Sequence, residues 1–361
     1  MLAARFKAKH PWLKRSIRLP VPSFGTTNLP IMDSLPTDVV RHILSYLDRR
    51  DLVRLTLISR RHISRPREAL YATLHINVFS PRSTLLHLLC VQEESTLIQT
   101  LQIPMPAQLV RHLTVIGTAL AHPARQSLVC QALGHMDNLL SLDIAIRTFP
   151  DSIAPDVFRE DVCRPATFLP NLLALKTDDV QLAIILVPGR PVYSVFVQDI
   201  VPEALRAPFM YALSKSKKPI TQLQIKLDVA TNDAASVAFD TIAAEFNRVS
   251  TLSLDLFIST PSERPLAWSS TKEIINRIGT ATSSLYQLHA MSINIYPEAY
   301  LAQRETEEVK EVLELFRRYS QGIQYIEFKW HEWTLSAGLR RVECGAQSLR
   351  GQWAFKRHAR S

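Results

Sequence analysis

Few residues in this sequence have the types and spacing that catalysis requires. The neighbouring carboxylates Asp178-Asp179 and Glu307-Glu308 would serve as an acid and a base only if they converged, and side chains at adjacent positions point apart. His331-Glu332 lacks the second histidine of a HExxH zinc site. Neither a GxSxG turn nor an HxE with PCxxC pair occurs. We therefore expect no enzyme activity.

Cofactor motifs are also missing. The chain has nine glycines and contains neither GxGxxG nor GxxxxGK[ST], so no glycine-rich loop presents backbone amides to a phosphate. Its four cysteines, Cys90, Cys130, Cys163 and Cys344, lie far apart with no CxxC pair. This spacing favours reduced thiols over a zinc site or a disulfide framework. We expect no cofactor and no metal.

Length and charge limit the class of protein. A chain of 361 residues that is 47% hydrophobic has room for one small module and one large domain. No apolar run approaches the roughly 18 residues of a membrane span, so we expect a soluble protein with no membrane contact. Of 42 basic and 33 acidic residues, 14 and 5 lie in residues 1–70, which leaves 28 of each in the main body. That balance argues against nucleic-acid binding there.

The basic residues gather at the two ends. Residues 1–30 contain no acid and four prolines, which is typical of a flexible tail. A nuclear import signal and a mitochondrial presequence remain alternatives for this tail. Residues 340–361 form a second basic tail, expected to fray. The aromatic cluster before and within it, with Trp330, Trp333 and Trp353, favours a cap on the end of the preceding domain.

Residues 31–71 are predicted to form a small helical module. Pro36 suits a first helical position, and Val39, Ile43 and Leu47 recur at helical spacing. Asp51 is predicted to cap a second helix, and a third is predicted over Ser59–Arg65, ending at Pro66. Fewer than about 40 residues rarely fold alone, and these carry more apolar side chains than their own interior needs. A partner surface is the natural place for the excess.

At these positions the module resembles the F-box. The matching residues are Leu35-Pro36, Asp38, Ile43-Leu44, Leu47, Asp51-Leu52, Leu55 and Ile58-Ser59-Arg60. His62 departs from the bulky residue that the family usually has there. The resemblance implies docking to the Skp adaptor of a cullin-RING ubiquitin ligase. The residues that it places against the adaptor are Leu35, Pro36, Ile43, Leu44, Leu47, Leu52 and Ile58. A three-helix start to a larger core and a DNA-reading helix-turn-helix remain alternatives.

From Tyr71 onward an apolar pattern recurs nine times, with the spacing x, x+3, x+5. It occurs at Tyr71-Leu74-Ile76, Val110-Leu113-Val115, Leu139-Leu142-Ile144, Leu172-Leu175-Thr177, Val192-Val195-Val197, Ile220-Leu223-Ile225, Val249-Leu252-Leu254, Ala290-Ile293-Ile295 and Ile323-Ile326-Phe328. Helical spacing separates several of these units, at residues 127–136, 203–214, 234–246, 272–278 and 305–319. Alternating strands and helices predict an α/β fold with a parallel sheet.

Residues 72–339 resemble the irregular leucine-rich-repeat domains that often follow an F-box. The resemblance implies a solenoid whose strands line one face. The position that commonly holds Asn or Cys in such repeats differs here, with Thr118, Arg147 and Val180 among its occupants, so no asparagine ladder is expected from it. A compact α/β domain and an unrelated fold remain alternatives.

Side chains between the apolar strand positions should face the open side of such a sheet. The ones expected to bind a target protein are Lys176, Phe196, Gln224, Lys226, Asp255, Tyr296 and Tyr325. The function implied is that of a cytoplasmic or nuclear substrate receptor, which holds an unknown protein substrate beside the cullin-RING ligase core. A non-catalytic F-box scaffold outside ubiquitination is the alternative. A nucleic-acid binder that uses the basic ends is a third hypothesis.

Overall fold

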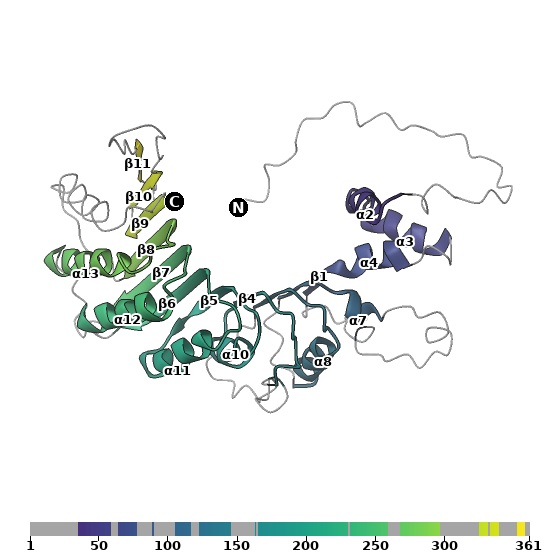
Figure 1. The fold of residues 1–361 in the computed structure, drawn as a ribbon, viewed down its shortest axis with the longest axis horizontal. Coiled ribbons are helices and arrows are strands. Elements are labelled where there is room, and N and C mark those ends of the chain that lie inside the picture. Colours follow the sequence, from purple (N-terminus) through teal and green to yellow (C-terminus); the bar gives the residue numbers. More distant parts are fainter. Residues whose placement is uncertain are drawn as a thin grey trace. The chain divides into compact units, whose positions relative to one another are not determined.

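The computed structural model describes residues 35–58, 64–77, 89, 105–116, 123–145, 163, 165–229, 232–258, 268–296, 325–330, 333–338 and 352–357. The chain divides into two compact units, Met1–Leu47 and Asp48–Ser361, so the boundary falls inside the predicted helical module. Helix α2 (Thr37–Ser45) belongs to the first unit (Figure 1). The other helices and strands with described residues belong to the second.

Helix α2 begins at Thr37, one residue after Pro36, which was predicted to suit the first helical position. Pro36 precedes it with extended backbone, and Val40 N donates to Pro36 O over 3.1 Å. Asp38 lies in the first turn, where its carboxylate interacts favourably with the positive end of the helix dipole.

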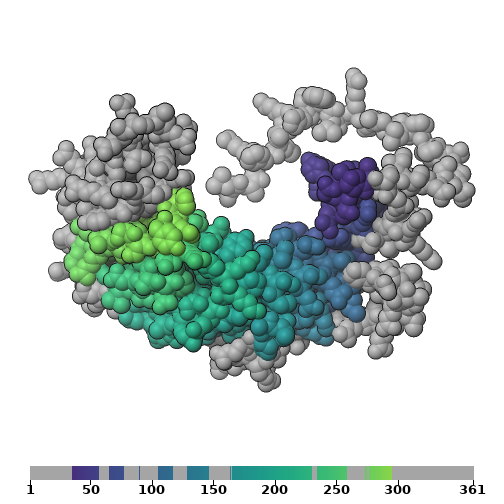
Figure 2. Space-filling view, viewed as in Figure 1, coloured from purple at the N-terminus to yellow at the C-terminus, as the bar shows by residue number. Residues whose placement is uncertain are grey.

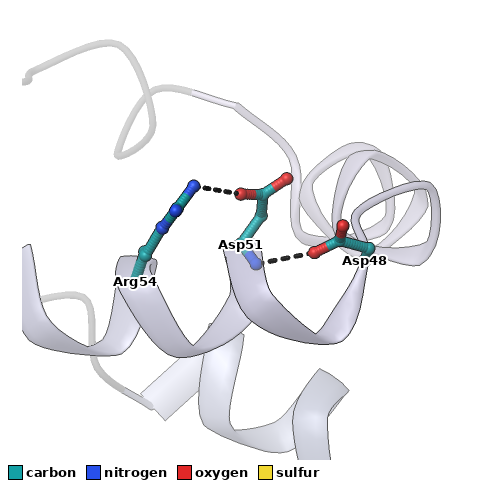
Figure 3. A network of polar contacts seen from close by, with 3 residues as sticks. All are labelled: Asp48, Asp51 and Arg54. Carbon is teal, nitrogen blue, oxygen red and sulfur yellow. Dashed lines mark hydrogen bonds and ion pairs between the residues drawn. The ribbon is translucent and has the colours of Figure 1, made fainter.

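Helices α3 (Arg49–Ile58) and α4 (Ser64–Ala72) begin differently from their predictions. Asp48, rather than Asp51, caps α3, because Asp51 N donates to Asp48 Oδ1 over 2.8 Å (Figure 3). Asp51 forms an ion pair with Arg54 instead, at 3.2 Å. Pro66 lies in the first turn of α4 and does not end a helix. The first turn tolerates proline because its N–H groups have no partner within the helix.

In the described ranges, eleven strands form one sheet in sequence order. Every pairing from β1 to β9 is parallel, which confirms the mixed α/β prediction. These strands are β1 (Thr73–Asn77), β2 (His112–Ile116), β3 (Ser141–Ala145), β4 (Ala174–Thr177), β5 (Ser194–Val201), β6 (Gln222–Val229), β7 (Thr251–Ile258), β8 (Ala290–Tyr296) and β9 (Tyr325–Trp330).

A recurring pair of main-chain hydrogen bonds joins the starts of neighbouring strands from β2 to β8. Arg111 O, just before β2, accepts from Leu140 N over 2.7 Å and from Ser141 N over 3.0 Å. Leu140 O then accepts from the corresponding amides before β4. The same pair of hydrogen bonds is accepted by Leu173 O, Tyr193 O, Thr221 O and Ser250 O. These bonds tie the start of each strand to its neighbour and make successive units structurally equivalent.

The eighth unit begins two residues earlier than predicted. Leu252 of β7 pairs with Met291, so the unit reads Leu288-Met291-Ile293 instead of Ala290-Ile293-Ile295. Leu288 and Met291 are both buried, as this register requires. Side chains alternate across a strand with a period of two, so a two-residue slip keeps the same residues inward and leaves the sequence pattern almost unchanged.

The described helices that follow β1 lie along one side of the row of strands (Figure 1). Figure 2 shows the successive strand–helix repeats of the second unit as bands of colour, each against the next. These helices are α7 (Pro106–Leu109), α8 (Pro123–Gly134), α10 (Val180–Leu186), α11 (Glu203–Ser214), α12 (Asn232–Glu245) and α13 (Trp268–Thr282). The predicted helices at 127–136, 203–214, 234–246 and 272–278 overlap α8, α11, α12 and α13. The helix predicted at 305–319 lies outside the described residues.

Helix α10 was not predicted, because its seven residues are almost all apolar and show no helical period. Asp179 caps it, and its carboxylate accepts hydrogen bonds from Gln181 N and Leu182 N. Burial raises the pKa of Asp179, while those two hydrogen bonds act in the opposite direction.

These contacts predict opposite behaviour for two substitutions of Asp179. Asp179→Ala should lose about 1 kcal/mol of unfolding free energy with the cap, whereas Asp179→Asn keeps an acceptor oxygen and removes the buried charge. At neutral pH the Asn variant should therefore match or exceed the wild type. Because the pKa is raised in the folded state, the wild type gains relative to Asn as the pH falls. Urea denaturation at pH 7 and 5 measures both effects, and an Asn variant as weak as Ala would contradict them.

Two asparagines outside the predicted ladder position connect neighbouring units. Asn138 Nδ2 donates to Gln108 O over 2.8 Å, and Asn171 Nδ2 donates to Asp137 O over 2.9 Å. Both lie just before a strand, in the turn that follows the preceding helix or loop. The side-chain amide there donates to a main-chain carbonyl of the previous repeat. The predicted ladder position was several residues after each strand instead.

Arg190 is fully buried between α10 and β5, a role that no pattern in the sequence predicted. Its Nε donates to Phe168 O over 2.7 Å, and its Nη1 to Leu186 O over 2.9 Å. Its Nη2 donates to Pro165 O over 3.0 Å, and further bonds reach the carbonyls of Cys163, Ile185 and Pro188. Burial lowers the pKa of Arg190 to about 10, which leaves the guanidinium charged at neutral pH.

The backbone adjusts to bring these carbonyls together. Gly189 has a φ of +71°, and a Cβ built there would lie 3.4 Å from Ala166 Cβ. Leu169 also has a positive φ, of 51°, which is uncommon for a residue with a side chain. Both unusual conformations precede Arg190 in the sequence: Gly189 is its immediate neighbour, and Leu169 follows Phe168, whose carbonyl accepts from the guanidinium.

The end of the sheet differs from the rest. β10 (Trp333–Gly338) pairs antiparallel with β9 and with β11 (Gln352–Arg357). The C-terminal tail was expected to fray from residue 340, and this was wrong for Gln352–Arg357, which forms a strand. Trp330 and Trp333 face each other in register across the β9–β10 hairpin, and Trp353 lies in β11. The basic tail predicted at 1–30 lies outside the described residues.

Candidate functional site

Helix α2 and its C-cap have two apolar stripes, and only one is buried. Val40 and Leu44, four residues apart, are each 1% exposed. Val39, Ile43 and Tyr46 lie one residue before or two after them and form a neighbouring stripe, with exposures of 39%, 42% and 76%. The exposed stripe therefore consists of apolar side chains that the folded chain does not bury.

The predicted adaptor residues of the first unit differ in how much of their side chains is exposed. Ile43 is exposed, and Pro36 is exposed beside the helix start. Leu35 and Leu47 are half-buried. Leu44 is buried, so it offers no surface in this conformation. Val39 and Tyr46 are exposed apolar residues that the prediction left out. The helical spacing of Val39 and Ile43 was the signal that could have identified the stripe.

Tyr46 ends the exposed stripe with a polar contact. Its ring lies edge-on to the His42 ring, with centroids 4.9 Å apart and planes at 81°. Tyr46 Oη and His42 Nε2 are 3.3 Å apart. The contact holds the tyrosine ring along the helix surface, which leaves most of the ring exposed. Tyrosine is enriched at protein interfaces because it combines a large apolar ring with a hydroxyl.

In the second unit, α3 offers one further exposed apolar residue. Val53 is 42% exposed, whereas its neighbour Leu52, a predicted adaptor residue, is buried. The capping bond at Asp48 and the Asp51–Arg54 ion pair fix the first turns of this helix (Figure 3). Ile58 ends α3, and its side chain lies outside the described residues.

The strand face opposite the helices is the second candidate surface. Burial alternates along the strands, as in β3, where Leu142 and Ile144 are buried and the residues between them are partly exposed. The parallel register then aligns the partly exposed residues of neighbouring strands into rows. One such row runs from Asp143 through Lys176 and Phe196 to Gln224.

In that row, Lys176 contacts both of its neighbours, Asp143 and Phe196. Lys176 Nζ lies 2.9 Å from Asp143 Oδ2 and 5.5 Å from the centroid of the Phe196 ring. The side chains of Lys176 and Asp143 remain 43% and 31% exposed, so the ion pair itself contributes little to stability. The arrangement fixes a cation against an aromatic ring on an open surface. Lys176 and Phe196 were predicted site residues, and Asp143 is an addition that the register identifies.

A second polar group lies farther along the strands. The pairing of β5 with β6 shifts between Phe196 and Ile200, which places the 40% exposed Ile200 opposite Lys226. Lys226 then pairs in register with Asp255, and Asp255 Oδ1 accepts a hydrogen bond from Asn294 Nδ2. The register therefore makes Lys226 and Asp255, two of the predicted site residues, neighbours in adjacent strands.

The two predicted tyrosines lie at the ends of other rows. Tyr296 pairs in register with Phe257, and Tyr325 pairs with Ala290. Both belong to strands, but their side chains lie outside the described residues. The register brings neither of them into the row of Lys176 and Phe196.

Within the described ranges, no group of three or more His, Cys, Asp and Glu residues is placed to hold a metal ion. No helix in the same ranges combines the length and apolarity needed to cross a membrane. The groups whose pKa shifts are resolved there are Cys130, Asp179 and Arg190, and none of them belongs to the α2 stripe or to the row of Lys176 and Phe196.

Comparison with known proteins identifies one segment. Residues 32–64 match the family model described as F-box-like. This segment contains α2 and α3 and therefore every residue of the exposed apolar stripe. No curated protein matches the chain.

Proposed function

From the F-box-like domain at residues 32–64, we propose that this protein is the substrate-recognition subunit of a cullin-RING ubiquitin ligase. Its F-box-like domain binds a Skp-type adaptor, and its strand face binds a target protein. The observation that carries the proposal is the exposed apolar stripe Val39, Ile43 and Tyr46 in the domain whose family docks adaptors.

The stripe has the properties of a docking surface. Isolated exposed apolar residues are ordinary, but three on one helix face form a patch that water solvates poorly. Burial of such side chains contributes roughly 25 cal/mol per Å² of apolar area. The aliphatic Ile43 at the middle of the stripe and the tyrosine at its end supply an apolar centre and a polar rim.

A reconstitution tests the adaptor part of the proposal. The full chain and a purified Skp-type adaptor should elute together on size-exclusion chromatography, and addition of a cullin N-terminal domain should give a ternary complex. Binding of the adaptor without the cullin would favour the scaffold alternative. Separate elution of chain and adaptor would refute the docking role.

The strand face supports the target-binding part. All-parallel sheets usually have both faces covered, yet the strand residues opposite the described helices stay partly exposed. Repeated strand–helix units of this kind form extended binding surfaces in solenoid proteins. We infer that residues 72–339 form a leucine-rich-repeat-like domain whose strand face binds the target through Lys176, Phe196, Gln224, Lys226 and Asp255. Tyr296 and Tyr325 extend this proposed surface along β8 and β9.

In this function the protein performs no chemistry of its own. It holds the target near the ubiquitin-charged enzyme that the ligase recruits. Tethering converts an encounter between two proteins into an effectively intramolecular one and raises the effective concentration of a target lysine.

The double variant Lys176→Ala/Phe196→Ala should lose targets without losing the adaptor. Truncation of an exposed aromatic and its cation removes the centre of the proposed surface, which we expect to weaken target binding at least about tenfold. Tyr211→Ala is the matched control, because Tyr211 is an exposed aromatic on α11, with Lys215 Nζ 4.7 Å from its ring centroid. Affinity purification with degradation blocked should recover proteins with the wild type and the control that the double variant lacks. Identical partners for all three would refute this surface.

A further inference from the structure

Two thiols that lie far apart in the sequence meet inside the second unit. Cys130, in α8, and Cys163 are 33 residues apart, and their Sγ atoms are 3.6 Å apart. Both are buried, and they are not joined by a disulfide in this structure. The sequence spacing suggested only isolated reduced cysteines, so this pair is a product of the fold.

Their surroundings hold the pair in place and favour reaction at one member. Arg190 Nη2 donates to Cys163 O, which fixes the main chain of Cys163 within the arginine cluster. Cys130 lies on a helix whose neighbours Val129 and Leu133 are in the core. The hydrogen bond from Cys163 lowers the pKa of the Cys130 thiol, although burial acts in the opposite direction. A lowered pKa increases the fraction of thiolate, which is the nucleophilic form.

We infer that Cys130 and Cys163 form a reversible disulfide when the protein meets a peroxide. The Cys130 thiolate attacks one peroxide oxygen and the O–O bond breaks, which gives a sulfenic acid and hydroxide that is protonated to water. The Cys163 sulfur then attacks Cys130 Sγ, the S–O bond breaks, and the Cys163 proton leaves with the hydroxyl as a second water. The two thiols lose two electrons and two protons, and hydrogen peroxide takes up both to form two waters.

The geometry permits this with side-chain movement. The sulfurs must approach from 3.6 Å to about 2.05 Å, and rotation about the cysteine side chains changes their separation without breaking a strand pairing. Peroxide is small enough to reach Cys130, the more exposed of the two at 8%, through local opening. The disulfide would close a loop that contains β3, including Asp143 of the strand face. It would therefore stabilise this part of the sheet, whatever the protein binds.

The test uses the full chain with Cys90→Ser and Cys344→Ser, which leaves only the two thiols in question. After treatment with hydrogen peroxide, the protein is denatured and alkylated with N-ethylmaleimide. We expect both thiols to escape alkylation, the unlabelled mass to fall by two hydrogens, and dithiothreitol to restore both labels. The melting temperature of the oxidised form should rise by roughly 5 °C.

A third substitution, Cys130→Ser, is the control and should abolish the loss of two hydrogens and the rise in melting temperature. Two labels that persist after peroxide, or stepwise addition of oxygen without a cross-link, would overturn the inference. If the double variant fails to fold, peptide mapping of the oxidised wild type decides the question. A linked pair containing Cys130 and Cys163 supports the inference, and links only to Cys90 or Cys344 refute it. Adaptor binding is not needed for either result.

Discussion

Replacement of Ile43 by Asp is expected to abolish adaptor binding and leave the protein folded. Ile43 is 42% exposed at the middle of the α2 stripe, so the free protein loses little packing when its side chain becomes polar. In the complex, a carboxylate would lose its water against an apolar surface with no partner. We expect a loss of at least about 3 kcal/mol, or roughly 100-fold in Kd, measured by titration of the adaptor.

The same helix supplies the control for this prediction. Ser45 is exposed and lies away from both stripes, so Ser45→Asp introduces the same charge and should bind the adaptor nearly as well as the wild type. Leu44→Asp is a poor test, because Leu44 is 1% exposed and a charge there would disrupt folding as well as binding. Ile43→Asp that binds normally, with a melting temperature like that of the wild type, would rule out the stripe as the adaptor surface.

Arg190→Met is expected to destabilise the second unit severely. Methionine fills much of the volume but donates nothing, so the six main-chain carbonyls bound by the guanidinium lose this donor together. Buried acceptors without donors cost about 1–3 kcal/mol each when water cannot reach them, and removal of a buried charged partner typically costs about 3–5 kcal/mol. We expect a loss of at least about 3 kcal/mol in unfolding free energy by urea denaturation, a large share of the stability of an ordinary domain.

Arg111→Met provides a matched control in the same unit. Arg111 forms an exposed ion pair with Glu68 at 3.3 Å, and such pairs contribute at most about 1 kcal/mol. Arg190→Lys should also be strongly destabilised, because an ammonium group cannot reproduce the planar fork of donors. A loss below about 1 kcal/mol for Arg190→Met would mean that other donors replace the guanidinium.

The two variants, Ile43→Asp and Arg190→Met, test the two compact units independently. Ile43 lies in the first unit and Arg190 in the second. Loss of the adaptor with Ile43→Asp should therefore leave the urea transition of the second unit unchanged. Arg190→Met should lower the stability of the strand face and with it the retention of any target bound there.

Local patterns in the sequence were enough to identify most elements. The x, x+3, x+5 spacing located the nine parallel strands, because alternation of side chains across a strand is a property of short segments. The match to the F-box likewise depended on residues close together in the chain, and the family comparison confirmed an F-box-like segment at 32–64. The same locality explains the errors. A two-residue slip in β8 leaves the pattern intact, and either Asp48 or Asp51 suits a helix cap.

Which residues are exposed depended on the tertiary structure. The sequence gives α2 enough apolar residues for two stripes, but packing decides that Leu44 is buried and Ile43 is not. Register decides that Asp143, Lys176 and Phe196 meet, although they come from three strands. The Arg190 cluster and the Cys130–Cys163 pair join segments more than twenty residues apart. No periodicity encodes such contacts, because they arise only when separate segments pack together and buried polar groups must find partners.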